Sequence, residues 1–268
     1  LYTVASLQVA GVLFRREAVL LGDVSGVEAM LDPNTSGKKL RIPSFSETLA
    51  LYGVVFILVL YGGGILQQLS LSVGVLITPF VLVFGTTWLW ARFGFWNLKA
   101  SFYWNDTKAS GWIGGALLGL GAWALVLPLV AWLNDSFLPL PQEMMEKAAE
   151  LLSTERTLMA MIAIDFGITF GAGFCEEFLF RGPILKSARN TMPTWAAVVI
   201  TALLFAILHL SVHRLTGTFL LGIVAGWIVV MTGSIFPAML FHTTHNALVV
   251  TMGRLSMGEE QGSAEFPE

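Results

Sequence analysis

The stretch TLALYGVVFILVLYGGGILQQLSLSVGVLITPFVLVFGTTWLWA, residues 48–91, contains no Asp, Glu, Lys or Arg. Three further stretches share this property, and they are residues 109–134, 190–208 and 215–253. The hydrocarbon core of a bilayer is crossed by a helix of about 20 apolar residues, so each stretch can supply one or two spanning helices. The predicted fold class is therefore all-α, a polytopic transmembrane helix bundle.

The composition of the whole chain supports this class. Of the 268 residues, 55% are hydrophobic and 12% are charged, and the mean hydropathy is +0.73. An ordinary soluble domain is far less apolar and carries about twice this fraction of charged residues. The net charge of -3 gives no reason to expect a nucleic-acid partner. The single cysteine, Cys175, excludes an internal disulfide, and we expect it to pack among apolar neighbours.

The hydropathy pattern predicts about seven full spans and a partial one at residues 1–14. The seven are residues 47–67, 71–91, 111–133, 157–189, 195–212, 216–232 and 235–252. The chain accordingly divides into three parts. Residues 1–45 form a partial membrane helix and a polar linker, and residues 46–255 form the membrane domain. Residues 256–268 form an acidic C-terminal tail.

Basic residues in the connections predict how the bundle is oriented. Arg92, Lys99 and Lys108 follow the second span, and Lys186 and Arg189 precede the turn after the fourth. Cytoplasmic loops carry an excess of Lys and Arg, so we expect both connections in the cytoplasm. The connection between the third and fourth spans is mainly acidic, and we expect it on the opposite side together with the C-terminal tail.

Several polar side chains lie within the predicted spans, among them Glu176, Glu177, His209, His242 and Asn246. A charged residue at the centre of a membrane helix costs about 2.5 to 3.5 kcal/mol on insertion scales, so such residues indicate a functional site. In straight helices, Glu176 and His209 both lie about 21 Å from the turn that joins their spans. His242 lies roughly 12 Å from its own turn, and Asn246, one helical turn further, nearly reaches the depth of the first two.

These residue types suit the hydrolysis of an acyl group by activated water. Two adjacent carboxylates resist simultaneous ionisation, which favours a general acid or base, and Arg181 lies on the same helix face as Glu177. Water polarised by Glu176 and His209 could attack a carbonyl, and His242 and Asn246 could hold the oxyanion. The sequence contains no HExxH, GxSG or GxGD motif.

At these residues the chain resembles the CAAX protease and bacteriocin-processing family (CPBP, Abi) of intramembrane glutamate proteases, which includes the type II CAAX prenyl endopeptidases. The family pattern EExxxR occurs at residues 176–181, FxxxH at 205–209 and HxxxN at 242–246. The resemblance covers roughly residues 45–255, and no motif position departs from the pattern.

The resemblance implies an intramembrane protease domain over residues 46–255, in a multi-pass protein of the cell membrane. Its implied catalytic residues are Glu176, His209, His242 and Asn246, with Glu177 and Arg181 in support. It implies no bound metal and no other cofactor. The implied partners are the lipid bilayer and a membrane-embedded or lipid-anchored protein or peptide substrate, for which a CAAX-like lipidated tail is one option.

The opening residues, LYTVASLQVAGVLFRREAVLLGD, more weakly resemble the end of an ABC-2 type permease. Permeases of this kind are sometimes fused ahead of such domains. We therefore expect an association with an ABC transporter.

Other functions remain open at this stage. A zinc-dependent hydrolase would use Glu176, His209, His242 and His245 as ligands. A transporter accessory or bacteriocin-immunity protein would keep the polar residues for packing alone, and a proton-coupled carrier would move substrate without cleaving it. We expect Phe205, His213 and His245 to have structural roles.

Overall fold

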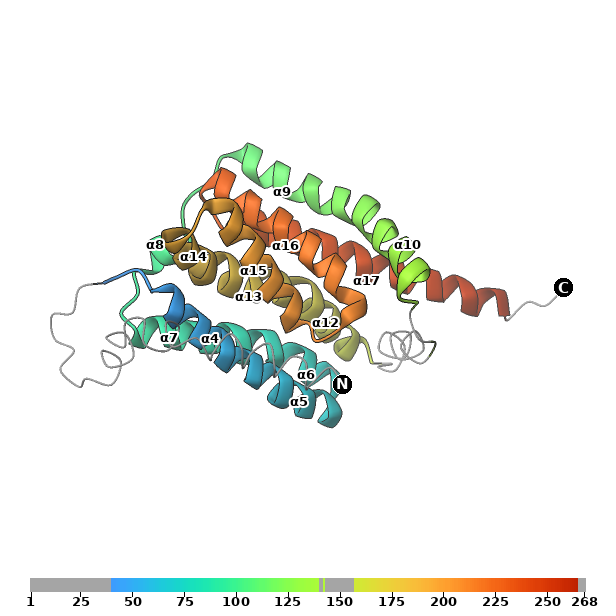
Figure 1. The fold of residues 1–268 in the computed structure, drawn as a ribbon. Helices are drawn as coiled ribbons and strands as arrows, with labels where there is room; N and C mark the ends of the chain where they lie inside the picture. The colour runs from blue at the N-terminus through green and yellow to red at the C-terminus, as the bar shows by residue number, and fades with distance from the viewer. Residues whose placement is uncertain (1–39, 140–141, 143–156, 265–268) are drawn as a thin grey trace.

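The computed structural model describes residues 40–139, 142 and 157–264 of the chain (Figure 1). Within these ranges the regular structure is helical, with an isolated bridge between Arg41 and Trp96 and no β-strand. The predicted all-α class is confirmed. The partial span expected at residues 1–14 lies outside the described residues.

The first two spans form a hairpin along one side of the bundle (Figure 1). The first consists of α4 (Phe45–Ile57), the π-helical segment η1 (Leu58–Gly63) and α5 (Gly64–Leu69), and the second of α6 (Leu71–Ile77), η2 (Thr78–Gly85) and α7 (Thr86–Phe93). Ser44 begins α4 with a capping box, in which its side chain and that of Glu47 each accept from the other's backbone N–H. Ser70 joins the two helices, because it ends α5 and caps the first turn of α6.

The third span follows the short helix α8 (Leu98–Ser101) and is continuous from α9 (Ala109–Gly121) through η3 (Ala122–Val126) to α10 (Leu127–Phe137). The fourth consists of α12 (Leu158–Phe166), η4 (Gly167–Gly171), α13 (Ala172–Leu179), η5 (Phe180–Ile184) and α14 (Leu185–Thr191).

The fourth span is not the single straight helix that the sequence led us to expect. Gly182 leaves the helical region with φ -76° and ψ -113°, and Pro183 follows it. Proline has no N–H to donate and disfavours helical dihedrals in the residue before it, so the chain bends here. The bend lies directly after the EExxxR motif.

Three helices complete the bundle, namely α15 (Thr194–Leu208), α16 (Val212–Thr232) and α17 (Phe236–Ala264). The helix predicted over 195–212 ends earlier than expected, at Leu208. His209 caps it, and Leu210 has a positive φ of 52° in the tight turn to α16. The boundary expected at residue 256 falls inside α17, which runs on to Ala264.

All seven predicted spans are helical, although not all have the same length and apolarity. Among the described residues, five helices are long and apolar enough to cross a membrane. They are Phe45–Leu69, Leu71–Phe93, Ala109–Phe137, Leu158–Thr191 and Val212–Thr232. The apolar helix α15 is shorter, at 15 residues. The protein is therefore a multi-pass integral membrane protein.

Glycines let several of these helices touch backbone to backbone. A Cβ on Gly173 of α13 would lie 2.8 Å from the backbone nitrogen of Thr243 in α17. One on Gly119 of α9 would lie 2.6 Å from the carbonyl oxygen of Phe241, also in α17. Small residues at such positions are how helices associate closely in lipid. The contact at Gly173 holds the Glu176 turn of α13 against α17.

We expect Gly173→Ala to destabilise the protein by about 1 to 3 kcal/mol, because its methyl group would overlap the Thr243 backbone. Thermal unfolding in detergent measures the effect. Gly114→Ala is the matched control, since a Cβ on Gly114 meets no atom within 4 Å. Equal unfolding temperatures for the two variants would contradict the close α13–α17 contact.

Candidate active site

Three polar side chains from three helices meet inside the bundle. Oε2 of Glu176, on α13, lies 4.0 Å from Nε2 of His209 and 4.0 Å from Nε2 of His242. His209 comes from the end of α15, and His242 comes from α17. The side chains of Glu176 and His209 are each 17% accessible, so the meeting point is sheltered without being sealed.

The hydrogen bonds of the two histidines indicate how both rings are protonated. Nδ1 of His209 lies 3.0 Å from the carbonyl oxygen of Phe205, and Nδ1 of His242 lies 2.9 Å from Oε1 of Glu177. A carbonyl or a carboxylate can only accept, so both Nδ1 atoms donate. In each neutral ring Nε2 is then an acceptor, and both Nε2 atoms face Glu176.

Behind His242 lies a buried ion pair. Nε of Arg181 is 3.1 Å from Oε2 of Glu177, and both side chains are about 1% accessible. Arg181 also donates from Nη2 to the carbonyl oxygen of Gly222 on α16, at 3.1 Å. The two glutamates therefore have different surroundings, because Glu177 is paired with Arg181 and His242 at 3.1 and 2.9 Å, while Oε2 of Glu176 lies 4.0 Å from each of two imidazole nitrogens.

Asn246 lies one helical turn after His242 on α17. Its Nδ2 donates to the carbonyl oxygen of Ile168 in η4, at 2.9 Å. A carboxamide nitrogen carries two hydrogens, so one N–H of Asn246 is left for another acceptor.

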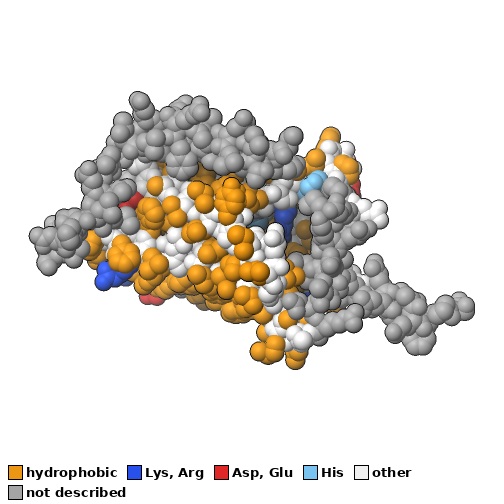
Figure 2. Space-filling model, turned by 90° about the horizontal axis from the view of Figure 1, so that it is seen from below, with side chains coloured by type: hydrophobic (Ala, Val, Ile, Leu, Met, Phe, Trp, Pro, Cys, Tyr) orange, Lys and Arg blue, Asp and Glu red, His pale blue; other side chains and the backbone are white. Residues whose placement is uncertain are grey.

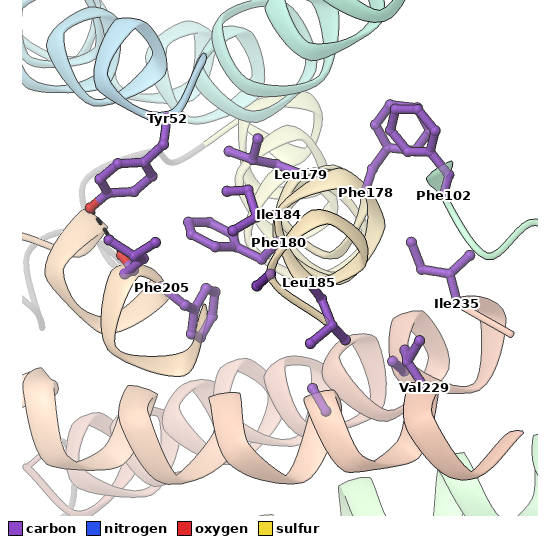
Figure 3. Packing of buried hydrophobic residues seen from close by; sticks show 14 of the residues in the cluster. Tyr52, Phe102, Phe178, Leu179, Phe180, Ile184, Leu185, Phe205, Val229 and Ile235 are labelled. Atoms are coloured by element: carbon purple, nitrogen blue, oxygen red, sulfur yellow. Dashed lines mark hydrogen bonds between the residues drawn. The ribbon is translucent and has the colours of Figure 1, made fainter. Parts of the chain in front are cut away.

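Phe205 packs against both histidines of the site and against Arg181. Figure 3 shows it projecting from α15 toward Phe180, with the ring centroids 5.2 Å apart. Its ring also lies edge-on to His209 and His242, at 4.8 and 5.7 Å between centroids, and the Arg181 guanidinium carbon is 4.6 Å from its centre. In the sequence, the spacing of four residues between Phe205 and His209 was the only indication that the two side chains lie together.

We expect Phe205→Leu to lower kcat roughly 10-fold with little change in KM, because aromatic contacts worth about 1 kcal/mol orient both histidines. Steady-state kinetics on a cleaved peptide would measure it. Leu203→Ala, on the exposed face of the same helix, is the control and should leave kcat unchanged. A variant that raised KM alone would show that Phe205 has no part in orienting the rings.

The other two histidines make different contacts. His213 contacts the carbonyl oxygen of Leu138 through Nδ1 at 3.2 Å and is half-buried. His245 is buried, and its Nδ1 has no hydrogen-bond partner in the described structure. In the described part of the chain, no group of three or more His, Cys, Asp or Glu side chains is arranged to hold a metal ion.

The fold and the site together define a multi-pass membrane protein with a sheltered carboxylate and two imidazoles inside its helix bundle. Residues 158–248 match the family model described as type II CAAX prenyl endopeptidase Rce1-like. The resemblance to the CAAX protease family is thereby confirmed over α12 to the middle of α17, which includes all six predicted site residues. At the level of the family, the match supports a CAAX-type membrane protease, a hydrolase.

The matched segment is narrower than residues 45–255, over which the motifs indicated a resemblance. It gives no support to an association with an ABC transporter. No curated protein and no solved structure matches the chain.

Proposed function

We propose that the protein is an intramembrane endopeptidase in which Glu176 and His209 activate water to hydrolyse a peptide bond. The observation that carries the proposal is the position of the Glu176 carboxylate, whose Oε2 faces two imidazole Nε2 atoms at 4.0 Å each. Its substrate would be a membrane-associated protein or peptide, with lipid-modified CAAX-like tails within that class. The bilayer of the cell membrane would be its setting.

The spacing suits a water molecule. A separation of 4.0 Å is too long for a direct hydrogen bond, and one water can reach both atoms. Such a water would donate one hydrogen to Glu176 and the other to Nε2 of His209. Glu176 would take the proton as the water oxygen attacks the substrate carbonyl, and would return it to the leaving amine. No covalent bond to the enzyme forms in this scheme.

Asn246 and His242 would hold the developing oxyanion. Asn246 has one N–H that Ile168 does not use, and a donor placed at an oxyanion is worth about 3 kcal/mol in the transition state. His242 donates to Glu177 from Nδ1, so its Nε2 can donate to an oxyanion only after it gains a proton. Glu177 and Arg181 would fix the orientation of the His242 ring.

A second candidate is a zinc-dependent hydrolase. It would hold the metal with Glu176, His209 and His242, since catalytic zinc is often held by two histidines and one glutamate, although these described side chains do not form a metal-ligand group as they stand. In the metal-free scheme we expect activity to be unchanged after dialysis against a strong chelator. Loss of activity that added Zn²⁺ restores would establish the zinc enzyme instead.

Mass spectrometry of a candidate peptide tests the proposal. The peptide is incubated in detergent with wild type or Glu176→Ala, with chelator present. Cleavage by wild type alone supports the metal-independent peptidase. If folded Glu176→Ala and His209→Ala variants behave as wild type both in detergent and in the cell, the protein is a non-catalytic scaffold.

A further inference from the structure

The end of α15, which carries His209, departs from the regular helical pattern. The backbone nitrogen of His209 donates to the carbonyl oxygen of Ala206, three residues back, at 3.3 Å. An α-helix would direct this N–H four residues back, to Phe205. The carbonyl oxygen of Phe205 instead lies 3.0 Å from Nδ1 of the His209 ring. The position of the ring therefore depends on the backbone of residues 204–210, which we call the His209 turn.

A tyrosine of the first span holds the start of the His209 turn. The hydroxyl of Tyr52, on α4, donates to the carbonyl oxygen of Leu204 at 3.0 Å, and Figure 3 draws this hydrogen bond as a dashed line. Tyr52 is only 7% accessible. The described side chains on the outer face of the first hairpin are mainly hydrophobic, which suits contact with lipid rather than water (Figure 2). A tyrosine hydroxyl buried here needs an acceptor from the protein, and Leu204 supplies it.

The Tyr52 ring also joins the aromatic contacts behind the candidate site. It lies edge-on to Phe180, with 6.0 Å between the ring centroids (Figure 3). Phe180 in turn lies edge-on to Phe205, and Phe205 lies edge-on to His209. Tyr52 is therefore connected to the His209 turn twice, through a backbone carbonyl and through two phenylalanine rings.

Other contacts fix α4 in place, as a helix that positions another must be. Near its start, Glu47 accepts from the indole nitrogen of Trp96 at 3.0 Å. The hydroxyl oxygens of Thr48 and Ser187 are 2.7 Å apart and buried, which ties α4 to α14. Thr48 lies one helical turn before Tyr52 on the same face. The same face of α4 thus links the end of the fourth span to the His209 turn.

We propose that Tyr52 is a positioning residue for His209. Resting on the proposed function, this inference gives the Tyr52 hydroxyl an effect on kcat, because it holds the turn that places the ring beside the attacking water. Tyr52 lies outside the family-matched residues 158–248. The first span thereby contributes to a site whose proposed catalytic residues come from α13, α15 and α17.

Tyr52→Phe tests the proposal, because it removes the hydroxyl and keeps the ring. We expect it to lower kcat for peptide cleavage roughly 5-fold, equivalent to about 1 kcal/mol in the barrier, with KM unchanged. KM should not change, because the His209 ring acts on water and not on substrate binding. An unchanged kcat overturns the inference while the proposed function stands.

Thr48→Val is the matched control. It removes the other buried hydroxyl contact of α4, and the Ser187 hydroxyl keeps the carbonyl oxygen of Ile184 as its acceptor. We expect it to lower the unfolding temperature in detergent about as much as Tyr52→Phe does and to leave kcat unchanged. If Thr48→Val loses as much kcat as Tyr52→Phe, Tyr52 has a merely structural role and the inference is overturned.

Nuclear magnetic resonance of the histidine ring nitrogens tests the positioning without a substrate. A ring held in one tautomer gives two well-separated nitrogen resonances, and exchange between tautomers brings them together. We expect the His209 pair, identified by its loss in His209→Gln, to converge in Tyr52→Phe, because a looser turn weakens the bond to Phe205. The His242 pair should stay separated, since Glu177 holds that ring.

The two measurements separate failure of the inference from failure of the proposed function. An unchanged His209 pair in Tyr52→Phe overturns the inference, whether or not the enzyme is active. If wild type cleaves no peptide even in detergent, the proposed function fails, and the resonances of His209 still decide whether Tyr52 positions its ring.

Discussion

Glu176→Gln is expected to lower kcat/KM for peptide cleavage by roughly 10³-fold, whereas Glu177→Gln should lower it only about 10-fold. The difference follows from their surroundings. Glu176 faces the two Nε2 atoms and acts as general base in the proposed reaction, a role typically worth 10²- to 10⁴-fold. Glu177 contacts Arg181 and His242 and acts through them.

Kinetics of the two purified variants on one peptide measure this difference. Glutamine keeps an oxygen that can accept from Nδ1 of His242, so Glu177→Gln preserves that hydrogen bond and removes the charge. Unfolding in detergent controls for misfolding of either variant. Equal losses of activity in two folded variants would contradict the assignment of Glu176 as the base.

Arg181→Met should cause the largest loss of stability, about 3 to 5 kcal/mol, because it leaves the fully buried Glu177 carboxylate without its cation. Denaturation in detergent micelles followed by circular dichroism measures it. Combining Arg181→Met with Glu177→Gln should restore part of the loss, since no unpaired buried charge then remains.

A more exposed ion pair provides the control for this effect. Arg254 and Asp165 link α17 to α12 with side chains 19% and 36% accessible. Surface pairs contribute about 0 to 1 kcal/mol, so Arg254→Ala should cost little. If Arg181→Met lost no more stability than Arg254→Ala, the buried pair would not have the importance assigned to it.

Much of the fold could be predicted from the sequence, because in lipid the length of an apolar stretch nearly determines a helix. The spans at 47–67 and 71–91 are examples, since the helices lie within two residues of those bounds at each end. The side-chain pairing of Glu177 with Arg181 also followed from a spacing of four residues in a helix.

The relative depth of the site residues in the membrane could not be predicted correctly, because the depths were calculated from the sequence on the assumption that every helix is straight. This calculation placed Asn246 nearest to the level of Glu176 and His209, with His242 closer to the cytoplasm. In the structure His242 is the residue that meets Glu176, and Asn246 binds Ile168. The bend at Gly182 breaks the assumption, because the chain between Glu176 and the turn does not run along one axis. In the sequence, the pair Gly182-Pro183 was the feature that could have indicated this bend.

Close packing was equally hidden from the sequence. The sequence has 27 glycines, and it does not show that Gly173 is one whose missing side chain makes room for another helix. Only the structure shows the Thr243 backbone approaching it. Likewise, the spacing of Phe205 and His209 did not reveal that one aromatic ring contacts two histidines and an arginine from three helices. Such contacts depend on how helices cross, which local patterns do not determine.

The central claim is that Glu176 and His209 act on the same water molecule, and a double-mutant cycle on kcat tests it most directly. Residues that act as a unit are strongly non-additive. We predict that Glu176→Gln combined with His209→Gln is no slower than the worse of the two single variants, within about 3-fold. Losses that multiply in the double variant would contradict a shared water and with it the proposed mechanism.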